Sequence, residues 1–113
     1  MAVLSTEIER RALLAARILN QVARVRTAYV FGSQVEGRAD AWSDIDVAVF
    51  LDGAESWDMQ RRAQTMFQVQ KGAGLDVEAH LFPSSMLVHP EPASFAAYVI
   101  KHGVPLSLEH DAA

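Results

Sequence analysis

Several features are missing from this sequence, and each absence excludes a class of protein. The 113 residues contain no cysteine, which excludes disulfides and thiolate metal sites and is compatible with a reducing compartment. No apolar run reaches the length of a membrane span, and the first residues lack the basic and then apolar pattern of a signal peptide. We therefore expect a cytoplasmic protein with no membrane partner.

Positive charge is also scarce. Ten lysines and arginines stand against 14 acidic residues, and the formal net charge is -4. Direct, sequence-independent binding to nucleic acid needs a broad basic surface, which this balance argues against. A nucleotide is therefore the expected ligand rather than a duplex.

The length and apolar content set the scale of the fold. The chain has 113 residues, of which 50% are hydrophobic, so it has the size and the apolar content to build a core unaided. Internal repeats and low-complexity segments are absent. We expect a single domain over residues 1–113.

Apolar residues at helical spacing predict three helices. The first is expected to begin at a capping box formed by Thr6 and Glu9. The second is expected to be capped by Ser56 and to end near Gly72, and the last to run from a Ser94 cap to His102. The expected buried stripes are Ile8, Ala12, Ala15, Leu19 and Ala23 in the first helix and Met59, Ala63, Met66, Phe67 and Val69 in the second.

Three short segments are predicted to be strands: Ala28 to Phe31, Asp44 to Leu51, and Leu75 to Phe82. The second is apolar on both faces, as in an interior strand. The third alternates, with Leu75, Val77, Ala79 and Leu81 on one face and Asp76, Glu78, His80 and Phe82 on the other. The order of elements predicts an α/β (α+β) fold in which one small mixed sheet is covered by helices.

The pair Gly32-Ser33 ends the first predicted strand. A glycine at this place lets the backbone approach a phosphate closely, and the serine adds a hydroxyl and an N–H donor. Alone, such a pair is an ordinary strand-to-loop turn. Whether the pair indicates a phosphate site depends on which residues lie beside it in the fold.

Asp44 and Asp46 open the next strand, two residues apart and therefore on one face. Between Ala39 and Gln60 the chain has six acidic residues and no lysine or arginine. Carboxylates beside a polyphosphate would repel it unless divalent cations bridge the two. The alternative is a solvated strand entrance, which the missing basic partners disfavour.

The polar face of the third predicted strand can supply a further carboxylate, Asp76 or Glu78, if this strand neighbours the second. A solvent-facing sheet edge is the alternative for this pair. His80 shares the face, and we expect it to be an ordinary surface histidine. The other three histidines have no metal-ligand spacing, so a zinc site is not expected.

With these residues in place, the chain resembles the minimal nucleotidyltransferases of the DNA polymerase beta superfamily. Their signature is GS, a spacer, and then DxD on the next strand, matched here by Gly32, Ser33, Asp44 and Asp46. The closing segment SFAAYVIKHGVPL is similar to the final helix, glycine and short apolar end of that family. The resemblance covers essentially the whole chain and implies a palm-like nucleotidyltransferase fold.

The resemblance also implies roles for individual residues. Gly32 and Ser33 would hold the terminal phosphates of ATP, and Asp44 and Asp46 would hold two Mg²⁺ ions. The third carboxylate of the family lies between apolar residues on the following strand, which Asp76 matches, with Glu78 as the alternative. A hydroxyl would then attack the α-phosphorus, and AMP would be transferred.

The loop after Gly32-Ser33 departs from the family pattern. Family members often carry basic residues where this chain has Gln34 and Glu36. Arg38 is the only basic residue of the loop. The departure implies either weaker binding of the triphosphate or a substitute role for Arg38.

The resemblance further implies a partner. Small members of this family act with an all-helical protein of the HEPN type in toxin–antitoxin pairs, in which the transferase adds AMP to the toxin. We therefore expect an antitoxin that AMPylates a HEPN-type toxin. Two alternatives are a non-catalytic module that blocks the toxin sterically, and a transferase for a free small molecule whose acceptor pocket forms in a homodimer.

Overall fold

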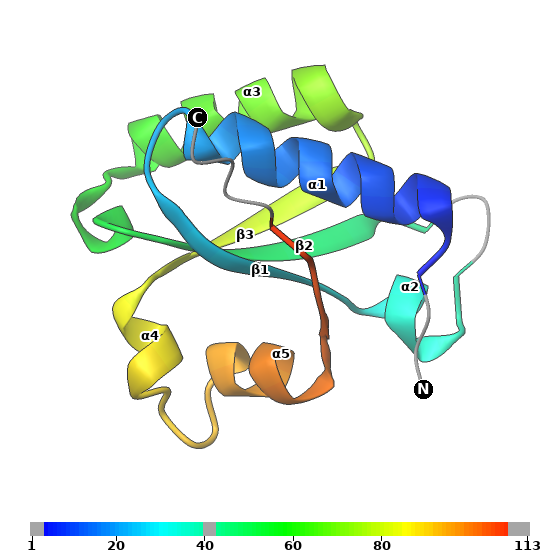
Figure 1. The fold of residues 1–113 in the computed structure, drawn as a ribbon. Helices are drawn as coiled ribbons and strands as arrows, with labels where there is room; N and C mark the ends of the chain where they lie inside the picture. Colours follow the sequence, from blue (N-terminus) through cyan, green and yellow to red (C-terminus); the bar gives the residue numbers. More distant parts are fainter. Residues whose placement is uncertain (1–3, 40–42, 109–113) are drawn as a thin grey trace.

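A computed structural model describes residues 4–39 and 43–108. Four strands form one mixed sheet in the order β3-β2-β1-β4 (Figure 1). They are β1 (Val25–Phe31), β2 (Ile45–Leu51), β3 (Val77–Pro83) and β4 (Val104–Pro105). β1 is antiparallel to both of its neighbours, whereas β2 and β3 are parallel. A parallel pair needs a crossover connection, which α3 (Met59–Ala73) provides.

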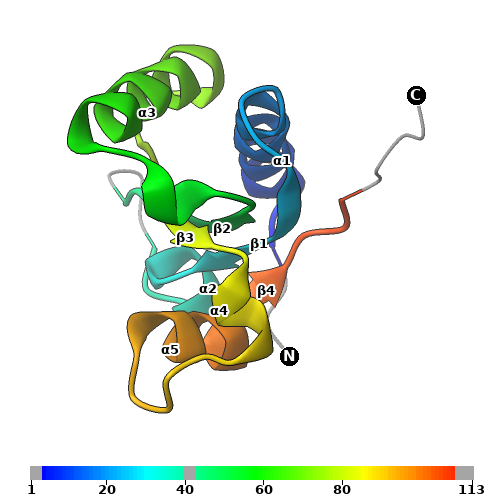
Figure 2. The same cartoon turned by 90° about the vertical axis from the view of Figure 1, so that its left-hand side faces the viewer.

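Helices lie on both faces of the sheet. α1 (Thr6–Asn20) and α3 lie side by side on one face, and α4 (Ser85–Val88) and α5 (Phe95–His102) lie on the other (Figures 1 and 2). A short helix, α2 (Ser33–Glu36), follows β1, and a 3-10 turn, η1 (Ala54–Ser56), follows β2. The mixed α+β architecture predicted from the sequence is confirmed.

The strand β2 is the centre of the core. Its residues from Val47 to Leu51 are all fully buried, as the apolar run predicted. Side chains of alternate residues enter two separate apolar clusters, one on each face. The cluster under α1 and α3 receives Ile45, Val47, Val49 and Leu51, and the cluster under α5 receives Ala48 and Phe50. Asp46 therefore lies on the face that α5 only partly covers.

Local helix signals are accurate to within a few residues. Ser5, rather than Thr6, caps α1 by accepting a hydrogen bond from the amide of Ile8. Asp58, rather than Ser56, caps α3, because residues 54–56 form the turn η1 instead. The cap at the end of α3 is Gly74 rather than Gly72. The predicted Ser94 cap and the helix to His102 are confirmed.

The predicted burial of α3 is partly wrong. Its buried residues are Thr65, Val69 and Ala73, whereas Met59 is 85% exposed and Phe67 is 64% exposed. Leu75, predicted as the first residue of the third strand, lies before β3 and is 84% exposed. The apolar spacing of α3 allows two overlapping stripes, and packing against α1 selects one of them.

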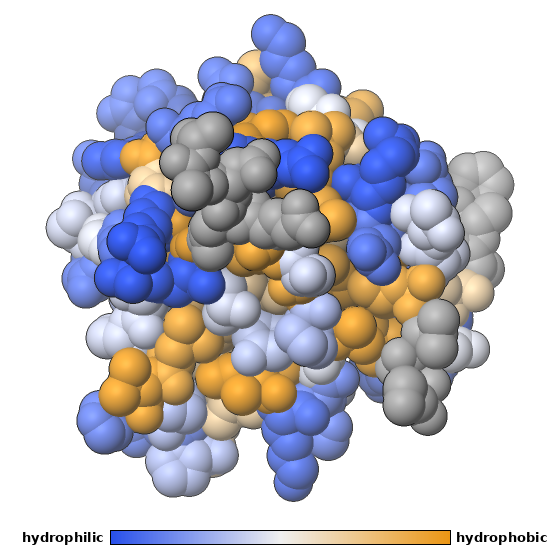
Figure 3. All heavy atoms as spheres, viewed as in Figure 1, coloured by the Kyte–Doolittle hydropathy of each residue, from blue (hydrophilic) through white to orange (hydrophobic). Residues whose placement is uncertain are grey.

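The α5 side of the molecule carries apolar surface. Figure 3 shows it over α4 and α5, and its exposed members include Met86, Val88, Phe95 and Tyr98.

The segment after α5, predicted only as a short apolar end, forms β4 on the open edge of β1. Among the described residues, no helix combines the length and the apolar character needed to cross a membrane.

Candidate active site

The candidate site lies where the end of β1 meets the beginnings of β2 and β3. Phe31 at the end of β1 pairs with Asp46, and Asp46 pairs on its other side with Glu78. Pairing in register brings residues from three distant parts of the sequence to adjacent positions. Gly32 follows β1 directly, so the predicted phosphate-binding pair lies next to the carboxylates.

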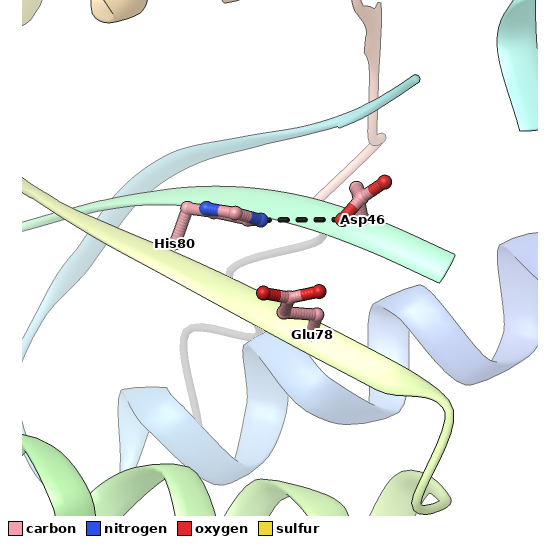
Figure 4. A group of neighbouring side chains, drawn as sticks. All are labelled: Asp46, Glu78 and His80. Atoms are coloured by element: carbon pink, nitrogen blue, oxygen red, sulfur yellow. Dashed lines mark hydrogen bonds and ion pairs between the residues drawn. The ribbon is translucent and has the colours of Figure 1, made fainter. Parts of the chain in front are cut away.

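Asp46, Glu78 and His80 form one group of side chains on the α5 face (Figure 4). Each offers one ligand atom, and these atoms all lie within 4.8 Å of one another. The Nε2 atom of His80 lies 3.2 Å from Oδ1 of Asp46, and both side chains are largely shielded from solvent, with 27% and 23% exposed. Glu78 is the exposed member of the group.

His80 was expected to be an ordinary surface histidine, and this expectation is wrong. Its ring makes edge contacts with Phe31 at 5.0 Å and with Phe95 at 5.6 Å between ring centroids. These aromatic neighbours restrict the imidazole and hold its Nε2 atom on Asp46. The alternation of the third strand had placed His80 on the face of Glu78, but alternation does not show what packs against that face.

Gly32 is in contact with the carboxylate of Asp46. Its φ of 79° lies in the left-handed region, and a Cβ built there would stand 2.7 Å from Oδ2 of Asp46. Any other residue would be strained by the backbone conformation and would push the carboxylate away. Gly32 is also the N-cap of α2, whose first residue is Ser33, so the chain passes from β1 into this helix beside the carboxylate.

Asp44 lies just before β2 and is exposed. It is not part of the group whose ligand atoms lie within 4.8 Å of one another. The side-chain amide of Gln34 lies 3.5 Å from the carbonyl of Ser43 and 3.4 Å from that of Asp44, and donates weakly to both. Gln34 thus ties α2 to the segment that carries Asp44.

Asp76, the first choice for the third carboxylate, lies away from the group. It precedes β3, and its carboxylate accepts hydrogen bonds from the guanidinium of Arg11 on α1. This hydrogen bond is the main cause that lowers the pKa of Asp76 below its ordinary value. The position of Asp76 therefore argues against the first choice and favours Glu78, the alternative.

Arg38, the proposed phosphate contact of the loop, is paired locally. Its guanidinium lies 3.3 Å from the carboxylate of Glu36, and both side chains are exposed. The hydroxyl of Tyr98 on α5 donates to the same carboxylate over 3.3 Å. Glu36 thus links the loop to α5 and forms an ion pair with Arg38, the one basic residue of the loop.

The carboxylates of the site are not paired with lysine or arginine in the part of the chain that the structure describes. Within residues 4–39 and 43–108, no lysine or arginine forms an ion pair with Asp44, Asp46 or Glu78. Arg62 instead donates to backbone carbonyls, including that of Ala54 at 2.7 Å, and Arg61 stacks 4.2 Å from the ring centroid of Trp57. Oxygen ligands of this kind suit a divalent cation, which would supply the missing positive charge.

Comparisons with known proteins identify the family and the fold of the chain. The model of the family described as "Polymerase beta, Nucleotidyltransferase" matches residues 15–108. A solved structure from Sulfolobus solfataricus, provisionally described as a nucleotidyltransferase, is similar in fold, with a TM-score of 0.50 and 23% identity over 73% of this chain and 76% of that chain. No curated protein sequence matches the chain.

Proposed function

The chain belongs to the polymerase beta nucleotidyltransferase family, and on that premise we propose that it transfers AMP from ATP to a hydroxyl group of a partner protein. One observation carries the proposal. Asp46 and Glu78 occupy paired positions on neighbouring strands, with Gly32 against Asp46 and no lysine or arginine among the described residues paired to them. This arrangement fits a polyphosphate held through divalent cations.

Each residue has a proposed role. Gly32 and Ser33 hold the terminal phosphates through the backbone at the start of α2 and the serine hydroxyl. Asp44, Asp46 and Glu78 hold two Mg²⁺ ions, which when bound neutralise the triphosphate and increase the acidity of the acceptor hydroxyl. Arg38 is a further phosphate contact if it leaves Glu36.

The reaction is an in-line displacement. The acceptor oxygen forms a bond to the α-phosphorus, the bond from that phosphorus to the bridging oxygen breaks, and pyrophosphate leaves. The proton of the acceptor hydroxyl passes through Glu78, the exposed carboxylate of the group, to solvent. Asp46, held between Gly32 and His80, stays fixed during the step.

The proposed acceptor is a hydroxyl of a HEPN-type toxin, which makes this protein an antitoxin acting in the cytoplasm. The family resemblance is the basis for this partner. The exposed Phe95 and Tyr98 support a protein acceptor, because they lie on α5 beside the site, where a partner would cover them.

The first experiment is a titration of ATP with Mg²⁺ into the wild-type protein and into the variants Asp46→Asn and Glu78→Gln. The matched control is Glu55→Gln, an exposed acidic residue on η1. We expect saturable binding in the wild type and the control, and its loss in both site variants. Equal binding in all four proteins would reject the site. If binding is lost in the site variants, transfer of AMP is measured next as an increase in the mass of the partner protein.

One observation favours a non-catalytic alternative, in which the module neutralises its partner only by binding. Glu36 stands where the family often has a basic residue, and it occupies Arg38. If Asp46→Asn neutralised the toxin as fully as the wild type, this alternative would replace AMP transfer.

A further inference from the structure

The group at the candidate site includes a nitrogen ligand, which an Mg²⁺ site does not require. His80 comes from β3, two residues after Glu78, and its Nε2 atom faces the carboxylate of Asp46. The ligand atoms of all three residues lie within 4.8 Å of one another, close enough to surround one ion. Figure 4 shows the imidazole and the two carboxylates turned toward a common region.

The imidazole is held in this orientation by its surroundings. Phe31 from β1 and Phe95 from α5 contact its ring at centroid distances of 5.0 Å and 5.6 Å. A side chain fixed in this way loses little conformational freedom on binding an ion. The neutral imidazole binds through the Nε2 lone pair, so a bound ion replaces the present contact of Nε2 with Oδ1 of Asp46.

The composition of the ligand set decides which ion is preferred. Mg²⁺ favours oxygen ligands and retains several waters, whereas divalent transition metals accept an imidazole together with carboxylates. We propose that Asp46, Glu78 and His80 form a mixed nitrogen and oxygen site that prefers a divalent transition-metal ion such as Mn²⁺ to Mg²⁺. This inference rests on the proposed function for its biological use, but it concerns a property of the site without nucleotide.

The test uses Mn²⁺ alone as the probe, with no ATP present. Electron paramagnetic resonance measures free Mn²⁺ and therefore its affinity, and pulsed measurements detect a directly bound nitrogen. We expect ¹⁴N coupling in the wild type and a preference for Mn²⁺ over Mg²⁺ in competition. In His80→Ala, we expect the coupling to disappear and the preference to fall by about tenfold.

Two further variants separate coordination from structural effects. His80→Gln keeps a hydrogen-bond donor near Asp46 but removes the imidazole, so it should lose the ¹⁴N coupling while retaining the fold. His89→Ala removes an exposed histidine at the end of α4 and should behave as the wild type. Asp46→Asn should weaken Mn²⁺ binding strongly.

The outcomes distinguish this inference from the proposed function. An unchanged ratio of Mn²⁺ to Mg²⁺ affinity in folded His80→Ala, or no ¹⁴N coupling in the wild type, would overturn the nitrogen ligand even if ATP bound as expected. A ¹⁴N coupling lost in both His80 variants would support it even if AMP transfer were never observed.

Discussion

Gly32 lies against the carboxylate of Asp46, and a Cβ at position 32 would stand 2.7 Å from its Oδ2 atom. The contact joins the two halves of the family motif, since 13 residues of sequence lie between Gly32 and Asp46. The proposed phosphate-binding turn and the proposed metal ligand therefore depend on the same backbone conformation. Gly37, at the other end of α2, has a similar φ of 75°, but a Cβ there would meet nothing within 4 Å.

The first prediction compares these two glycines. Gly37→Ala places a side chain in the αL conformation and should lower the free energy of unfolding by about 1–2 kcal/mol. Gly32→Ala, at φ 79° and ψ -149°, enters a region that is essentially restricted to glycine and should lower it by about 2–3 kcal/mol. Gly32→Ala alone should also displace Asp46 and weaken the binding of divalent cations. Chemical denaturation and Mn²⁺ titration of both variants measure the two effects separately. Equal Mn²⁺ affinity in the two variants would contradict the Gly32–Asp46 contact.

The second prediction decides the third carboxylate. Glu78→Gln should lower the rate of AMP transfer by at least about a hundredfold, equivalent to about 2.7 kcal/mol of transition-state stabilisation. The reason is that the variant loses both a proposed metal ligand and the proposed acceptor of the hydroxyl proton. Asp76→Asn should change the rate by less than about threefold, since this carboxylate lies before β3 and pairs with Arg11 of α1. Single-turnover transfer rates are the measurement. The reverse ranking would restore Asp76 as the catalytic carboxylate.

The third prediction concerns the dependence of stability on pH. The hydrogen bond from Arg11 lowers the pKa of Asp76 in the folded protein below its unfolded value, near 3.8. Because the unfolded state then binds more protons, this contribution is complete above the unfolded pKa and disappears as the pH falls through the folded pKa. The pair is partly exposed, with 46% of the Asp76 side chain accessible, so its worth is about 0.5–1 kcal/mol.

Thermal unfolding of Asp76→Asn and the wild type from pH 7 to pH 2 tests this ion pair. The variant should be less stable at pH 7, and the difference should close at the acid end. Glu55→Gln, an exposed acidic residue, is the control and should follow the wild-type curve. A gap that stays constant over the whole range would assign the effect to packing rather than charge.

The fourth prediction contrasts two adjacent arginines of α3. Arg62 donates to the carbonyl of Ala54 over 2.7 Å and more weakly to those of Trp57 and Leu81. Arg62→Ala should therefore cost about 1–3 kcal/mol of folding free energy, because carbonyls lose their donor. Arg61→Ala removes only an exposed contact with the Trp57 ring and should cost about 0.5–1 kcal/mol. Urea denaturation gives both values, and equal losses would contradict the structural role of Arg62.

Local patterns in the sequence determined the elements of this fold. Apolar spacing located α1, α3 and α5, although not α4, and the apolar run from Val47 to Leu51 identified the central strand, whose burial on both faces is confirmed. The spacing between Gly32-Ser33 and the two aspartates indicated the family, which the match to residues 15–108 shows. These signals are readable because each depends on residues close together in sequence.

Tertiary structure decided which side chains meet at the candidate site. Asp76 and Glu78 both satisfy the alternation of the third strand, and only the parallel register of β3 with β2 sets Glu78 beside Asp46. The packing of α1 gives Asp76 an arginine partner, and the ring of Phe95 on α5 holds His80 at the carboxylates. Strand register and helix packing join residues that are far apart in sequence, such as His80 and Asp46, 34 positions apart, or Arg11 and Asp76, 65 positions apart, so the local sequence carries no signal for them.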